Sequence, residues 1–248
     1  MVYENDIMMS FYDMGMRGDI KLTALLKHIN LAAGANADDL GIGINYTLSR
    51  GLTFVIQRFA LRVYDWPSYR QQVKIRTWPA GIERGTFRRN GDMWDKNGKK
   101  LAEWTGLWVL IDVKERKVRR PKALEIELPK HGPMDVSVEA HKLEIPEEAK
   151  LTASYRHVVR FSDADINQHM TNAVYGDLIA NVIEIAETPF SNIKLWEEIQ
   201  FNYLVEAKVG EEINVVCRQL GDALYIEGIV EDKTIFMATV KTSQKEIL

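Results

Sequence analysis

The sequence predicts an α+β fold with two antiparallel sheets, each wrapped around a long central helix. One observation is that apolar residues at helical spacing occur early in each half of the chain, and β-rich segments follow each time. Another is that the elements come in the same order in both halves, which indicates an internal duplication with a period near half the chain. A chain of 248 residues, 46% of them hydrophobic, can bury cores of this size.

The first half opens with a short candidate strand and a polar, glycine-containing turn from Asp13 to Asp19. A helix is expected next, because the following apolar residues recur at helical spacing: Leu22, Leu25, Leu26, Ile29 and Ala33. Gly34, Gly41 and Gly43 are expected to end it. Turn signals separate the strands expected after it, which cover residues 52–64, 71–77, 85–94, 100–111 and 123–128.

The second half repeats this order of elements. A strand is expected over residues 155–161, and a helix over residues 172–187 buries the face that carries Val174, Leu178, Val182 and Ile185. Further strands are expected near residues 193–203, 212–220, 223–231 and 235–242. Antiparallel strands around one long helix, occurring twice, form a tandem (double) hot-dog fold.

A charged, proline-containing stretch separates the two halves. It includes Leu128 to Pro133 and Ile145 to Glu148, a composition typical of segments that link domains. We therefore expect an N-terminal domain at 1–128, a linker at 129–150 and a C-terminal domain at 151–248.

Composition excludes several classes of protein. The formal net charge of −3 argues against general nucleic-acid binding, and the composition disfavours disorder and membrane spanning. The single cysteine cannot form an intramolecular disulfide, and acidic residues stand near Met1 where a signal peptide carries basic ones, so the cytoplasm is expected. Histidines lack the spacing of metal ligands, and no nucleotide-binding glycine motif is present, so neither a metal nor a cofactor is expected.

Polar residues with catalytic chemistry gather just ahead of the second expected helix. Asp165, Asn167 and His169 should converge near its N-terminus, where unpaired backbone N–H groups and the helix dipole favour an oxyanion. Asn167 can add an amide donor. Asp163 or Thr171 can equally serve as a capping residue, and spacing alone favours a structural role for a single histidine in this position.

This stretch resembles the acyl-acyl carrier protein (acyl-ACP) thioesterases, a double hot-dog family with the signature D-x-D-x-N-x-H-x-x-N-x-x-Y. Its fixed positions are occupied by Asp163, Asp165, Asn167, His169, Asn172 and Tyr175. The resemblance implies catalytic roles for Asp165, Asn167 and His169. It implies the same for Glu206, which lies in a segment that is similar to the family's Y-R-x-E-C.

One departure from the family pattern limits the mechanism. Ala207 stands where many plant members have cysteine, and the only cysteine, Cys217, lies in a later expected strand as a small packing residue. A thiolate nucleophile at the family position is therefore excluded. Asp165 and Glu206 remain as alternative bases, and either can instead attack covalently, while His169 orients a carboxylate or protonates the leaving thiolate.

The first half also resembles the family, in Thr77 to Arg84 and in Trp104 to Asp112. The resemblance implies hydrolysis of fatty acyl-ACP, which releases a free fatty acid and terminates fatty acid synthesis. Acyl-CoA hydrolysis, or acyl-thioester binding without catalysis, are the alternatives.

The turn at Asp13–Asp19 has no Asn-x-His pair, so one active site per chain is expected. The first half is then free to shape the acyl-chain cavity, with Leu25, Ile29 and Met16 as candidate lining residues or as plain core.

The implied partner is acyl carrier protein with a fatty acyl chain on phosphopantetheine. Because such carriers are acidic, a basic docking surface is expected. The densest basic run is Lys114–Lys122, and a second group comprises Arg84, Arg88 and Arg89; an exposed charge run is also often simply solvated. A monomer and a homodimer are both compatible with the sequence.

Overall fold

The computed structural model describes residues 1–128 and 134–242, so residues 129–133 of the expected linker and residues 243–248 lie outside the described residues. The chain forms two compact units. The first comprises Met1–Phe11 and Lys27–Ala140, and the second comprises Tyr12–Leu26 and His141–Leu248. The turn and the first helical residues of the N-terminal half thus belong to the second unit.

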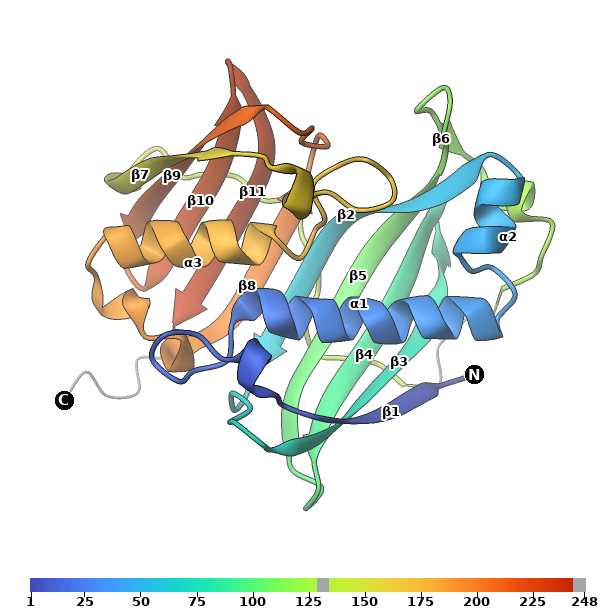
Figure 1. Ribbon diagram of the computed structural model, residues 1–248, viewed down its shortest axis with the longest axis horizontal. Helices are drawn as coiled ribbons and strands as arrows, with labels where there is room; N and C mark the ends of the chain where they lie inside the picture. Colours follow the sequence, from blue (N-terminus) through green and yellow to red (C-terminus); the bar gives the residue numbers. More distant parts are fainter. Residues whose placement is uncertain (129–133, 243–248) are drawn as a thin grey trace. The chain divides into compact units, whose positions relative to one another are not determined.

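The first unit contains an antiparallel sheet in the order β1-β3-β4-β5-β2 (Figure 1). A short strand, β6, pairs with β5 outside this order. The strands are β1 (Tyr3–Met8), β2 (Leu52–Val63), β3 (Gln72–Glu83), β4 (Thr86–Asp95), β5 (Lys100–Asp112) and β6 (Val118–Arg119). Helix α2 (Ile44–Ser49) precedes β2.

The second unit contains an antiparallel sheet in the order β8-β11-β10-β9-β7. Its strands are β7 (Lys150–Val158), β8 (Trp196–Tyr203), β9 (Glu212–Leu220), β10 (Ala223–Val230) and β11 (Lys233–Thr242). Helix α3 (Tyr175–Ile185) crosses this sheet (Figure 1).

Helix α1 (Leu22–Asp39) is longer than the glycine signals suggested. Gly34 lies exposed within it, because a glycine on the solvent side of a helix costs only about 1 kcal/mol and does not interrupt the backbone hydrogen bonds. The chain leaves the helix at Gly41, whose φ of 73° is readily adopted by glycine. The side chains of Leu25 and Ile29 are buried, whereas Met16, expected as a lining candidate, is 94% exposed.

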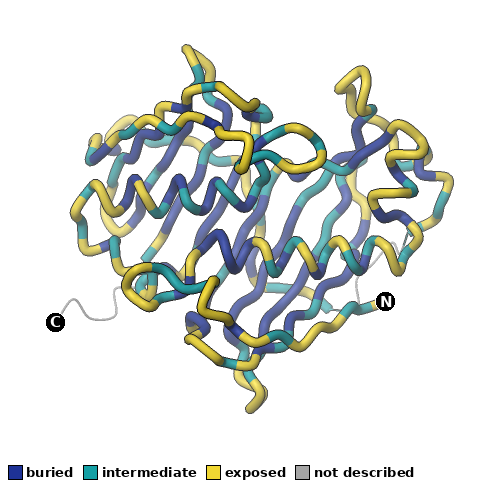
Figure 2. Tube along the Cα trace, in the orientation of Figure 1, coloured by how far each residue is buried: buried dark blue, intermediate teal, exposed yellow. Residues whose placement is uncertain are grey.

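Helix α3 buries Tyr175, Leu178, Ile179, Val182 and Ile183. The expected buried face ended with Ile185, but this residue is 50% exposed. The helix ends at Ile185, and the last buried residue on it is Ile183. Figure 2 shows that burial follows the strands and the inner faces of the helices, while the turns are exposed.

Two further expectations were wrong in detail. Residues 123–128 do not form a strand; the segment instead holds a 3₁₀ helix, Pro121–Leu124, which places Leu124 in a buried cluster with Leu52, Phe87 and Leu110. The strand expected over residues 155–161 is β7, which ends at Val158 and is followed by the 3₁₀ helix Phe161–Asp163.

The internal duplication extends to the turn before each long helix. A 3₁₀ helix, Phe11–Asp13 or Phe161–Asp163, precedes an isolated bridge, Met14–Ile20 or Ala164–Met170. In each turn the ends are closed by a backbone bond, from Lys21 to Asp13 over 2.8 Å and from Thr171 to Asp163 over 2.9 Å. The two turns therefore have the same backbone design and differ in their side chains.

Candidate active site

The turn between Ala164 and Met170 has a compact hydrogen-bonded backbone. The N–H of Asp165 donates to the His169 carbonyl over 3.0 Å, and the N–H of Gln168 donates to the Asp165 carbonyl over 2.9 Å. The Oδ1 atom of Asp165 also accepts the backbone N–H of Asn167 over 2.8 Å. Gln168 has a φ of 65°, in the left-handed region. The turn therefore brings Asp165, Asn167 and His169 together on one short piece of backbone.

Asp163 holds the entry to this turn. Its Oδ2 atom accepts the backbone N–H of Arg160 over 2.8 Å and lies 3.1 Å from Nε2 of His157. Neither capping candidate caps α3, whose N-cap is Val174 without a side-chain hydrogen bond. Asp163 is instead the third residue of the 3₁₀ helix Phe161–Asp163, and its carboxylate accepts from the backbone of the N-cap residue, Arg160. The role of this signature residue is therefore to support the turn.

His169 and Glu206 meet although they lie on different segments. Nε2 of His169 is 3.6 Å from Oε2 of Glu206, with the two side chains 19% and 31% exposed. Backbone pairing produces this approach, since His169 forms a bridge with Lys208 and the N–H of Met170 donates to Ala207 over 2.9 Å. The separation is longer than a hydrogen bond, so the two side chains form an ion-pair contact when the imidazole is protonated.

The remaining predicted residues lie on the same turn but differ in exposure. Asp165 is exposed, and Asn167 is partly buried. The structure thus joins His169 to Glu206 through their side chains and joins Asp165 to Asn167 through an Asx-type bond. Helix α3 begins only at Tyr175, so the turn is separated from its first residue by Thr171–Val174.

An aromatic cluster lies beneath the turn in the second unit. Tyr175 packs edge-on against Tyr203 and Phe236, with ring centroids 5.3 and 4.9 Å apart. The Tyr203 hydroxyl donates to the Asn172 carbonyl over 3.3 Å, and burial raises the pKa of both tyrosines. The signature residues Asn172 and Tyr175 therefore belong to the support of the turn. Sequence reasoning missed Tyr203 in this role, although Tyr203 ends an expected strand and occupies the tyrosine position of the segment that is similar to Y-R-x-E-C.

The equivalent turn of the first half carries different chemistry. Gly15, Arg17 and Asp19 occupy the positions of Asp165, Asn167 and His169, because Gly15 donates to the Asp19 carbonyl as Asp165 donates to His169. Arg17 donates to Oε2 of Glu184 over 2.7 Å, and Asp19 pairs with Lys194 over 3.1 Å, all within the second unit.

The counterpart of Glu206 is also replaced. The backbone N–H groups of Leu204 and Val205 both bond to Ile235, and those of Tyr64 and Asp65 both bond to Leu101. This match places Trp66, a buried tryptophan, where the second half has Glu206. The first half therefore lacks each of the four polar groups of the candidate site.

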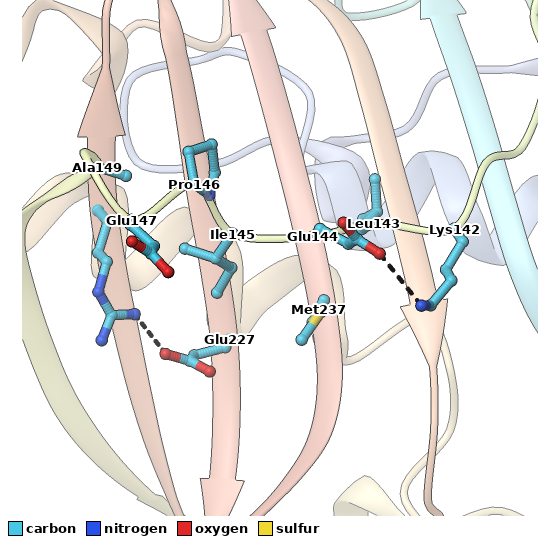
Figure 3. A pocket seen from close by; sticks show the side chains of 10 residues that line it. Lys142, Leu143, Glu144, Ile145, Pro146, Glu147, Ala149, Glu227 and Met237 are labelled. Carbon is cyan, nitrogen blue, oxygen red and sulfur yellow. Dashed lines mark hydrogen bonds and ion pairs between the residues drawn. The ribbon is translucent and has the colours of Figure 1, made fainter.

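A hollow of about 480 Å³ lies elsewhere in the second unit, where residues 142–149 cross the strands (Figure 3). Four of its charged groups form two ion pairs, Arg218 with Glu227 and Lys142 with Glu144, and Glu147 lines the hollow as well. Glu227 and Met237 are cross-strand partners there, and none of the four candidate catalytic residues lines this hollow.

Two negative findings apply to the part of the chain that the structure describes. Within residues 1–128 and 134–242, no three His, Cys, Asp or Glu side chains gather as metal ligands would. In the same ranges, no helix combines the length and apolar composition that a membrane crossing requires.

Comparison with known proteins identifies both halves. The acyl-ACP thioesterase N-terminal domain matches residues 1–124, and the acyl-ACP thioesterase C-terminal domain matches residues 146–246. The dodecanoyl-[acyl-carrier-protein] hydrolase of Cinnamomum camphora is 26% identical over 198 residues, or 74% of this chain and 51% of that protein. The palmitoyl-acyl carrier protein thioesterase of Cuphea hookeriana is 22% identical, over 71% of this chain and 45% of that protein. The chain spans about half the length of these curated relatives.

Solved structures show the same fold. The 12:0-ACP thioesterase from Umbellularia californica superposes with a TM-score of 0.82 at 18% identity, covering 98% of this chain and 97% of that one. An acyl-ACP thioesterase from Bacteroides thetaiotaomicron gives a TM-score of 0.77 at 20% identity, covering 98% of both chains. The predicted tandem hot-dog fold is confirmed.

Proposed function

The chain belongs to the acyl-ACP thioesterase family, and we propose that it hydrolyses the thioester bond of fatty acyl-ACP. The products are a free fatty acid and the carrier thiol, so the reaction terminates fatty acid synthesis. The observation that carries this proposal is the 3.6 Å approach of His169 to Glu206 beside the turn that holds Asp165 and Asn167.

The proposed reaction requires only the thioester and water, and no cofactor. A water oxygen adds to the thioester carbonyl carbon, the C–S bond breaks, and the thiolate takes up a proton. Glu206 and His169 form the proton-transfer pair, and Asn167 positions the thioester or the water. In the second scheme the Asp165 carboxylate attacks the carbonyl carbon, the C–S bond breaks, and the departing thiolate takes up a proton. Water then hydrolyses the resulting anhydride, which releases the fatty acid and restores the Asp165 carboxylate.

A cysteine nucleophile does not fit the structure. Cys217 is fully buried within β9, and burial raises the pKa of its thiol. A buried, protonated thiol is a poor nucleophile. Carboxylate chemistry is therefore the proposed route.

The two halves are proposed to divide the work. Residues 151–248 carry catalysis, residues 1–128 accommodate the acyl chain, and residues 129–150 link them. The second half of α1 supports this division, because it presents small residues where α3 presents large apolar ones. These small residues are Ala32, which is buried, and Ala33, Ala35 and Ala37, which are partly buried.

Acyl carrier protein with its phosphopantetheine arm is the proposed partner, and acyl-CoA is the alternative carrier. In the run Lys114–Lys122, Arg119 is paired with Asp112 over 2.7 Å, while Arg120 and Lys122 are exposed. In the second basic group, Arg89 is not available for docking, because its guanidinium donates a hydrogen bond to the buried Asn36. The proposed compartment is the cytoplasm, and a monomer or a homodimer is compatible with this role.

The test is thiol release from purified acyl-ACP across a ladder of chain lengths, with acyl-CoA of the same lengths in parallel. Asp165→Asn, Glu206→Gln and His169→Gln should each lower kcat/KM by about 10²-fold or more. Glu212→Gln is the matched control, because Glu212 is an exposed carboxylate of the same unit paired with Arg156. Unchanged hydrolysis in both carboxylate variants would remove the carboxylate scheme, and faster turnover of acyl-CoA would favour the alternative carrier.

A further inference from the structure

A polar pair lies between α1 and the sheet of the first unit. Nη1 of Arg89, on β4, donates to Oδ1 of Asn36, on α1, over 2.7 Å and lies 3.4 Å from Oγ1 of Thr77. Asn36 and Thr77 are fully buried. A guanidinium is thus held on the inner face of the sheet, although Arg89 belongs to a run of arginines in the sequence.

The groups of this pair that can still form hydrogen bonds are donors. Among the described residues, Nδ2 of Asn36 is buried without a hydrogen-bond partner, and its Oδ1 atom already accepts from Arg89. No carboxylate within residues 1–128 or 134–242 pairs with Arg89, and burial lowers its pKa to about 10. A buried cation and a buried amide donor leave a place for an acceptor oxygen.

The surroundings of the pair are largely apolar. Arg89, Gly106 and Phe59 stand opposite one another on β4, β5 and β2. The part of α1 around Asn36 carries Ala32, which is buried, and partly buried alanines on both sides of Asn36. Ligand sites typically combine such an apolar lining with a few fixed polar groups.

We propose that the Arg89–Asn36 pair binds an oxygen atom carried on the acyl chain itself, so that the first unit selects chains bearing a hydroxyl, keto or carboxylate group away from the thioester. The oxygen accepts from Nδ2 of Asn36 and from the Arg89 guanidinium. This inference rests on the proposed function, in which residues 1–128 hold the acyl chain.

A purely structural role for the pair predicts a different experimental result. If Arg89 only tied β4 to α1, its replacement would change stability and leave the ranking of ligands unaltered. Selection of an oxygen-bearing chain requires that the ranking change.

Binding is measured with methyl esters of fatty acids, in which the head carboxylate is masked, as competitors of a fluorescent fatty-acid ester. The hydroxyl, keto or ω-carboxylate group moves along a chain of constant length. The wild-type protein should bind at least one oxygen-bearing ester about tenfold more tightly than the plain ester, the gain expected of a hydrogen bond to a charged group. Absence of any such preference at every position would overturn the proposal.

Three variants test whether the preference for oxygen-bearing esters depends on the Arg89–Asn36 pair. Arg89→Met removes the cation and should abolish the preference, while Arg88→Met removes the neighbouring arginine, which points to the other face of β4, and should retain it. Asn36→Asp keeps the size of the side chain and pairs with the guanidinium, so it should fold and lose the preference as well. Equal effects of Arg88→Met and Arg89→Met, or a preference that survives in Asn36→Asp, would contradict the proposal.

Measurements on the same proteins distinguish a failure of this inference from a failure of the proposed function. If the wild-type protein hydrolyses plain acyl-ACP but shows no preference for oxygen-bearing esters, the inference is wrong and the proposed function stands. If it prefers those esters but hydrolyses no acyl-ACP, the site stands and the proposed function is wrong.

Discussion

Nε2 of His169 lies 3.6 Å from Oε2 of Glu206, and the two residues reach this position from different segments of the second unit. The approach depends on backbone pairing, since Met170 donates to Ala207 and His169 bridges Lys208. We therefore expect the imidazole and the carboxylate to act together in catalysis, so that removal of either side chain abolishes the contribution of the other.

A double-mutant cycle tests this coupling. Glu206→Gln and His169→Gln should each lower kcat/KM by about 10²- to 10⁴-fold, and the double variant should be no worse than the weaker single variant. The measurement is kcat/KM on one acyl-ACP, with thermal unfolding as a control for the fold. Reductions that multiply would show that the two side chains act independently.

Cys217 should have no part in turnover. Because the thiol is buried and burial raises its pKa, iodoacetamide should leave the native protein active. Cys217→Ala should hydrolyse acyl-ACP as the wild-type protein does, with a loss of stability from the small cavity. Lost hydrolysis in a Cys217→Ala protein that melts normally would restore a cysteine mechanism.

Gly176, at the start of α3, should not tolerate a larger residue. A Cβ atom there would lie 3.0 Å from the backbone N of Thr23 and 3.2 Å from Cγ of Leu22, within the second unit. Gly176→Ala should therefore lower the free energy of unfolding by about 1–3 kcal/mol in urea titrations.

Gly34→Ala is the matched control for this substitution. Gly34 is exposed within α1, and its added Cβ would meet no atom within 4 Å. Helix propensity alone should then raise the free energy of unfolding by about 0.5–1 kcal/mol. The packing argument fails if both alanines shift stability in the same direction.

Buried tyrosines should make the protein sensitive to alkali. Burial raises the pKa of Tyr155 to about 12 and raises those of Tyr175 and Tyr203 further, while an unfolded tyrosine ionises near 10. Since the folded state keeps these protons longer, the stability they contribute is present below pH 10 and is lost as the pH rises from 10 towards 12.

The measurement is the free energy of unfolding from pH 8 to 11.5, together with tyrosinate absorbance. Tyr155→Phe loses the hydrogen bond to Leu178 and should be less stable at neutral pH, yet its stability should fall less steeply above pH 10. Tyr69→Phe, at an exposed position, should keep the wild-type slope. Equal slopes in all three proteins would contradict the assignment.

Much of this protein is determined by local sequence. Helical spacing in Leu22–Ile29 and Val174–Val182 identifies both long helices, since a 3.6-residue period is a property of neighbouring residues. The repeated order of elements identifies the duplication, and the signature from Asp163 to Tyr175 locates the turn, because its residues are close in the chain. The absence of an Asn-x-His pair at Asp13–Asp19 likewise distinguishes the two turns by residue type alone.

Other features were decided only by tertiary structure. Ile183 is buried and Ile185 is exposed because the end of a helical stripe depends on where the partner surface stops. Arg88 and Arg89 look alike in the sequence, yet strand alternation and the position of Asn36 on α1 bring only Arg89 to the inner face. The meeting of His169 with Glu206 requires backbone pairing between distant segments, which no local period can specify.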